Sequence, residues 1–107
     1  MSFNARRLRP LGYTSNAVSS SAASQATSLA LPTGVVRSQI DLVLFICESS
    51  DVRWRDDGTA PGASSVSGAL FKTDGSLLYD GDPDKVKFVL NANSANPSTI
   101  HAYFYAG

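Results

Sequence analysis

The sequence has one cysteine, no cysteine pair and no long apolar run. A lone Cys47 excludes an internal disulfide framework and a cysteine-based zinc site. No apolar segment approaches the roughly 18 residues that cross a bilayer, so no membrane partner is expected. The arginine-containing start is not followed by the apolar stretch of a secretory signal. We therefore expect a chain that stays in the cell that makes it, or in a particle assembled there.

Catalytic groups are equally scarce, because His101 is the only histidine and no Gly-x-Ser-x-Gly turn accompanies it. Asp56 and Asp57 are adjacent, so on a strand their carboxylates point to opposite faces and do not converge on a substrate. The segment DGDPDK, residues 80–85, has acids at alternate positions but lacks the glycine and glutamate of an EF-hand. The sequence predicts a protein that is not an enzyme and has no cofactor or metal, with a different kind of calcium loop at 80–85 as the alternative.

Acidic residues are absent from residues 1–40, which hold four arginines, whereas residues 41–107 hold nine acids and five bases. A basic tail on an acidic body is typical of a segment that binds an oppositely charged surface. A neighbouring acidic subunit is favoured over nucleic acid, because the acidic body would repel phosphates. A solvated tail without a partner is the alternative.

The N-terminal part is also poor in apolar side chains, since residues 14–30 contain six serines and five alanines. Such a segment cannot offset its ordering entropy without docking on something else. We therefore expect residues 1–25 to form an extended or flexible arm, mobile in the isolated subunit, and residues 26–107 to form the folded body. The residues expected to anchor the arm to a partner are three arginines and three apolar residues, Arg6, Arg7, Arg9, Leu8, Leu11 and Tyr13.

The body shows strand patterns separated by turn residues. In residues 39–49 both faces are apolar, which predicts a central strand covered on both sides, and its β-branched content disfavours a helix. Asp74-Gly75 predicts a tight turn with a return strand behind it. The expected strands are 26–33, 39–49, 52–55, 69–72, 76–79, 85–91 and 99–107. About seven short strands predict an all-β fold, either a small antiparallel β-sandwich or a jelly-roll-like barrel.

The segment VRWRDDG, residues 52–58, combines apolar, basic and acidic residues in one strand and its exit. Its alternation predicts that Trp54 points inward as a core anchor against residues 39–49. Asp57-Gly58 supplies turn chemistry, so we expect a structural corner there, with aspartates that cap backbone amides or pair with Arg53 and Arg55.

The motifs VRWRDDGTAP, GALFKTDGSLLYDGDPDKVKFV and the terminal IHAYFYAG together resemble small virion proteins of tailed bacteriophages. The resemblance covers residues 40–107; FKTDGSLLY departs from the family pattern, which has an apolar-Ala-Ala-Gly turn there. It implies a structural role in the virion, assembled in the host cytoplasm.

With the basic arm and small core, the resemblance favours a capsid decoration or cement protein. Its expected partners are the major capsid protein or other virion proteins and further copies of itself, with a homotrimer favoured. A neck, tail or fibre component is the structural alternative. A carbohydrate- or ligand-binding sandwich lined by Trp54, Tyr79, Tyr103 and Tyr105 is the alternative of another class.

Overall fold

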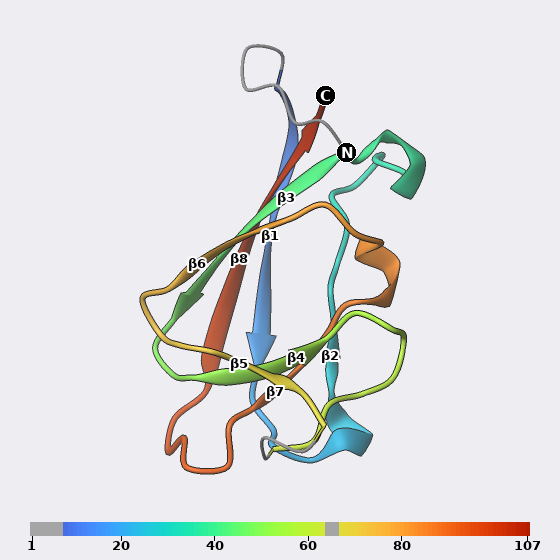
Figure 1. The fold of residues 1–107 in the computed structure, drawn as a ribbon. Helices are drawn as coiled ribbons and strands as arrows, with labels where there is room; N and C mark the ends of the chain where they lie inside the picture. Colours follow the sequence, from blue (N-terminus) through green and yellow to red (C-terminus); the bar gives the residue numbers. More distant parts are fainter. Residues whose placement is uncertain (1–7, 64–66) are drawn as a thin grey trace.

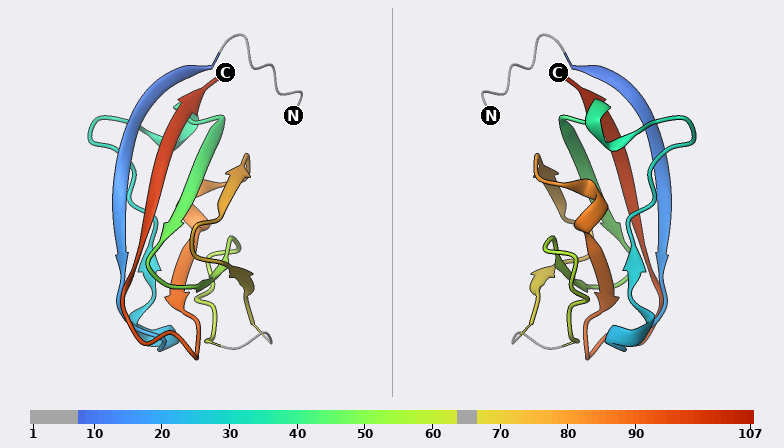
Figure 2. Two further views of the ribbon diagram at one scale, coloured as in Figure 1. Left: turned by 90° about the vertical axis from the view of Figure 1, so that its left-hand side faces the viewer. Right: turned by 90° about the vertical axis from the view of Figure 1, so that its right-hand side faces the viewer.

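The computed structural model describes residues 8–63 and 67–107, and these fold into two facing antiparallel sheets (Figure 1). The first sheet has the strand order β1-β8-β3-β6, with β1 at Arg9–Val18, β8 at Ser98–Ala106, β3 at Leu42–Glu48 and β6 at Ser76–Tyr79. The second sheet has the order β2-β7-β4-β5, with β2 at Thr27–Ser28, β7 at Lys87–Leu90, β4 at Val52–Arg55 and β5 at Ala69–Phe71. Figure 2 shows β1, β8 and β3 side by side along one side of the molecule. The predicted small antiparallel sandwich is confirmed.

The pairing of the strands is nested along the chain. β1 pairs with β8, β2 with β7, β3 with β6 and β4 with β5. Each pair lies within the previous one in sequence, as in a long hairpin folded across two sheets. This is the strand order of a jelly roll, an architecture found in viral capsid domains, lectin domains and cupins.

The core lies between the sheets and consists of inward-facing residues from both. Phe45 of β3 meets Phe88 of β7 edge to face across the two layers, with ring centroids 5.7 Å apart. On β8, Ile100, Ala102 and Phe104 are completely buried, while the residues between them face outward. The period-two alternation of the sequence therefore decides which face of each strand enters the core.

The expected boundary between arm and body at residue 25 is wrong, because Arg9–Val18 form the ten-residue strand β1 of the first sheet. β1 pairs along its length with β8, interrupted by an irregularity between Pro10 and Gly12. Ser/Ala-rich chain has little apolar surface of its own, but here backbone pairing with β8 and burial of Val18 supply the stabilisation. The prediction for residues 1–7 lies outside the described residues.

Two further strand predictions need correction. β3 is central in its sheet, but only its inner face is covered by the second sheet; on the outer face Leu44 and Ile46 are half-buried. The turn at Asp74-Gly75 is tight, yet β6 is not the hairpin partner of β5, because the two strands belong to different sheets. Instead, backbone hydrogen bonds join the turn to the end of β3. The Asp74 N–H donates to the Cys47 carbonyl, and the Cys47 N–H donates to the Gly75 carbonyl. The chain therefore crosses from one sheet to the other at this point.

Candidate interaction surface

The outer face of the first sheet carries a row of large apolar and aromatic side chains that runs across all four strands. The strand register places Tyr13 opposite Tyr103, Tyr103 opposite Leu44, and Leu44 opposite Leu78. We call these four residues the apolar row. Tyr13, Tyr103 and Leu78 are 45%, 37% and 61% exposed, so the row is open to solvent. The rings of Tyr13 and Tyr103 lie 4.9 Å apart, which makes the two side chains one continuous aromatic platform.

Next to the apolar row, three polar side chains from three strands form a hydrogen-bonded chain. The Tyr13 hydroxyl lies 2.6 Å from Nδ1 of His101, and Nε2 of His101 lies 2.6 Å from Oε1 of Glu48. Both ring nitrogens of His101 are therefore engaged by its neighbours across the sheet. Ser15, which is opposite His101 in the register, finds neither nitrogen free to act as a base. The three side chains therefore hold one another in place on the outer face of the sheet.

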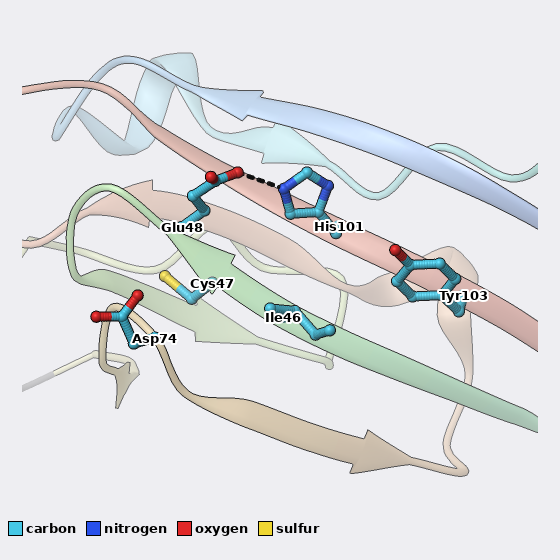
Figure 3. Close-up of a pocket in the computed structure, with 6 residues that line it drawn as sticks. All are labelled: Ile46, Cys47, Glu48, Asp74, His101 and Tyr103. Atoms are coloured by element: carbon cyan, nitrogen blue, oxygen red, sulfur yellow. Dashed lines mark hydrogen bonds and ion pairs between the residues drawn. The ribbon is translucent and has the colours of Figure 1, made fainter.

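A pocket of about 350 Å³ opens on this face at the end of β3 (Figure 3). The half-buried side chains of Ile46 and His101 and the exposed ring of Tyr103 line it, together with Cys47. The carboxylates of Glu48 and Asp74 complete the lining. The carboxylates come from the end of β3 and from the turn after β5, which the backbone bonds of that turn hold against β3. The pocket therefore combines an apolar floor with acidic groups at its edge.

Cys47 belongs to the pocket wall, but its thiol group is buried and hydrogen-bonded within the fold. It lies 3.1 Å from the Ser50 carbonyl and 3.6 Å from the Ser98 hydroxyl. Burial raises the pKa of the Cys47 thiol, and the hydrogen bond with Ser98 opposes this only partly. A buried thiol with a raised pKa is a weak nucleophile.

The corner after β4 is built from the residues singled out in the sequence. The Arg55 guanidinium donates from Nε to Oδ1 of Asp57 at 3.1 Å, and the Thr59 N–H donates to the same oxygen. The hydrogen bond from Arg55 holds the pKa of Asp57 below its usual range. Gly58 has a φ of 82°, a backbone conformation that side-chain-bearing residues seldom adopt. Asp56 accepts a hydrogen bond from the Tyr79 hydroxyl at 3.1 Å, so both carboxylates bind groups of the fold itself.

Trp54 is not the fully buried anchor that the sequence suggests. Its side chain is half-buried on the second sheet, and its ring meets Tyr79 edge to face at 5.9 Å. Its aromatic contact is therefore with β6, and the side chain packs at the edge of the core. The four aromatic residues of the predicted ligand site are also separated. Trp54 and Tyr79 pack together between the sheets, whereas Tyr103 and Tyr105 alternate with the buried residues of β8 and face outward.

The residues predicted to anchor the arm have different places. Arg6 and Arg7 lie outside the described residues, Leu8 precedes β1, and Arg9 is exposed at its start. Leu11 is partly buried and packs against the chain's own core. Tyr13 belongs to the apolar row. Sequence reasoning assigned Tyr13 to an arm and missed Glu48 and Leu78, whose link to the site depends on strand register.

In residues 8–63 and 67–107 no three His, Cys, Asp or Glu side chains are grouped as a metal site would require. The loop at 80–85 uses Asp82 to pair with Arg37, Nε to Oδ1 at 2.6 Å, and to cap the Asp84 N–H. The described part of the chain also contains no helix long and apolar enough to span a membrane. Comparisons with protein-family models, with curated proteins and with solved structures found no match.

The positive φ of Gly58 predicts that this position of the corner tolerates a side chain poorly. Gly58→Ala should lower the free energy of unfolding by about 1–2 kcal/mol, because a Cβ is strained at this φ. No atom lies within 4 Å of the added Cβ, so strain is the whole effect. Gly58→Asn is the matched control and should lose less, since asparagine tolerates this conformation. Equal losses for the two variants in urea unfolding would contradict the assignment.

The lowered pKa of Asp57 predicts that the stability of the fold depends on pH. A carboxyl with a lowered pKa stabilises the fold above its ordinary pKa of about 3.9, and the effect disappears as the pH falls through the lower folded value. Asp57→Asn should therefore be less stable than the wild type at pH 6 and should converge with it in strong acid. Melting temperatures of both proteins across pH 2–6 measure this, and a constant difference would contradict it.

Proposed function

We propose that this chain is a structural protein of a bacteriophage virion, of the decoration or cement class, which attaches to other virion proteins through the outer face of its first sheet. The observation that carries the proposal is the exposed apolar row of Tyr13, Tyr103, Leu44 and Leu78. A contiguous apolar surface of this kind marks an interaction site, because single exposed apolar residues are common but a row across a whole sheet is not.

Three other features agree with an assembly role. The nested strand order is one that viral capsid domains use, although a fold alone does not decide a function. Residues 40–107 resemble small virion proteins in VRWRDDGTAP and the strands that follow. In the structure, Arg55, Asp57 and Gly58 of that motif form a fixed corner, which is a structural use of those residues. A domain of this size also gains stability from contacts with neighbouring subunits.

The partners in this proposal are the major capsid protein or other virion proteins, together with sister copies, a trimer being the favoured assembly. Mass spectrometry of purified virions tests the placement by counting copies. Hundreds per particle support a decoration protein of the shell, about a dozen support a neck or tail component, and none overturns the virion proposal.

The attachment face is tested by adding purified protein back to particles that lack it. Leu78→Ser should weaken binding about tenfold or more, because Leu78 is the most exposed side chain of the apolar row. The matched control is Leu70→Ser: Leu70 is 41% exposed but lies on β5 of the second sheet. Equal binding of the two variants would overturn the assignment of the face.

A further inference from the structure

The pocket at the end of β3 has the composition of a site for a long basic side chain. Ile46 offers an apolar surface for methylene groups, and the Tyr103 ring offers a face for a cation. Glu48 and Asp74 place two carboxylates at the rim (Figure 3). Among the described residues Asp74 forms no ion pair, and Glu48 pairs only with His101. A guanidinium suits such a site best, because it stacks on aromatic rings and binds carboxylates in a planar fork.

Three of the six arginines lie in the first nine residues of the sequence, whereas Arg37 and Arg55 pair with aspartates of their own subunit. Arg6, Arg7 and Arg9 fall within nine residues, and the first acidic residue of the sequence is Asp41. The positive charge of this segment is complementary to the negative charge of the pocket rim. We propose that the pocket binds an arginine side chain from the N-terminal segment, residues 1–9, of a neighbouring copy of this chain.

Reach decides between the chain's own segment and that of a neighbour. Arg9 is opposite Ala106 at one end of β8, whereas the pocket residue His101 is opposite Ser15. The six residues from Arg9 to Ser15 cover about 20 Å of strand. The carboxylate of Glu48 is further away, because Glu48 is opposite Thr99 and Thr99 is opposite Ala17, eight residues or about 26 Å of strand from Arg9. Arg6 is only three residues before Arg9, so the backbone between them spans at most about 11 Å, and an extended arginine side chain does not make up the difference. A chain leaving β1 would also have to reverse direction to approach the pocket. The chain's own Arg6 and Arg7 therefore fall short, and another copy supplies the arginine.

A segment of one copy in a pocket of the next is a heterologous contact. Such contacts join subunits head to tail and close into a ring when the rotation between copies permits it. This agrees with a cyclic homo-oligomer such as the proposed trimer. The inference rests on the proposed function only in treating the outer face as a contact surface, and it needs no virion. A test without particles therefore separates its failure from failure of virion attachment.

A charge exchange between two full-length variants tests the inference. One variant carries Arg6→Glu and Arg7→Glu, and the other carries Glu48→Lys and Asp74→Lys. Each variant alone pairs like charges, so self-association measured by sedimentation velocity at low salt should be at least about tenfold weaker than in the wild type. The 1:1 mixture restores opposite charges wherever unlike variants meet, which is two of the three contacts in a mixed trimer. It should therefore associate more strongly than either variant alone, with a strength that falls as salt is raised.

The control removes the same amount of negative charge elsewhere, with Asp80→Lys and Asp84→Lys on an exposed loop. It should associate as the wild type does. Because Glu48→Lys also removes the contact with His101, the neutral pair Glu48→Gln and Asp74→Asn is a second variant and should likewise weaken association. A wild type that stays monomeric, or a mixture no more associated than its components, would overturn the inference.

Discussion

Replacing Phe104 by alanine should destabilise the protein by about 3–5 kcal/mol, because the ring is completely buried between the sheets and its removal leaves a cavity. A domain of this size has a total stability of roughly 5–15 kcal/mol, so the loss is a large share of it. We expect the melting temperature to fall by roughly 15–30 °C. Thermal unfolding followed by circular dichroism measures the change.

The matched control is the preceding residue on the same strand, Tyr103. Tyr103 points to the opposite face of β8 and is 37% exposed, so Tyr103→Ala should cost much less stability than Phe104→Ala. The same Tyr103 variant should weaken association, since its ring belongs to both the apolar row and the pocket. A Tyr103 variant as unstable as the Phe104 variant would show that the outer face contributes to the core of the isolated subunit.

Replacing Asn16 by alanine should cost about 2–4 kcal/mol, because Asn16 is 4% exposed and its amide joins three parts of the chain. Its Nδ2 donates to the Ile100 carbonyl at 3.1 Å, and its Oδ1 accepts from the Ala30 N–H at 2.9 Å. The alanine variant leaves both backbone groups without these partners. Urea unfolding of the purified protein measures the loss.

Ser15→Ala is the control for this prediction, because Ser15 lies beside Asn16 on β1 but is exposed. It should change the free energy of unfolding by less than about 0.5 kcal/mol. The comparison also decides whether β1 belongs to the body. If residues 9–18 were a mobile arm, both variants would be as stable as the wild type.

The strands that sequence reasoning located are those in which apolar alternation carries the information. In β8 the pattern of residues 99–107 already separated His101, Tyr103 and Tyr105 from the buried residues. β1 was missed because its sequence is dominated by small and polar residues. Its place in the sheet depends on pairing with β8, eighty or more residues away in the sequence, and on the hydrogen bonds of Asn16. No local pattern encodes such contacts.

The candidate surface was only partly accessible to sequence reasoning for the same reason. Tyr103 and His101 could be placed on one face, but their neighbours Tyr13, Leu44 and Leu78 come from three other strands. Only the register of the sheet joins them in a row. The partial exposure of Leu44 could not be predicted either. The sequence shows that Leu44 is an apolar residue on a central strand, but not whether a second layer covers that face of the sheet.

Hydroxyl-radical footprinting of the free protein and of the protein on assembled particles tests most directly whether the outer face of the first sheet is the contact surface. We predict that Tyr103 and Leu78 become protected on assembly, while Leu70, which is exposed on the second sheet, keeps its reactivity. Protection of Leu70 with unchanged Tyr103 and Leu78 would contradict the account.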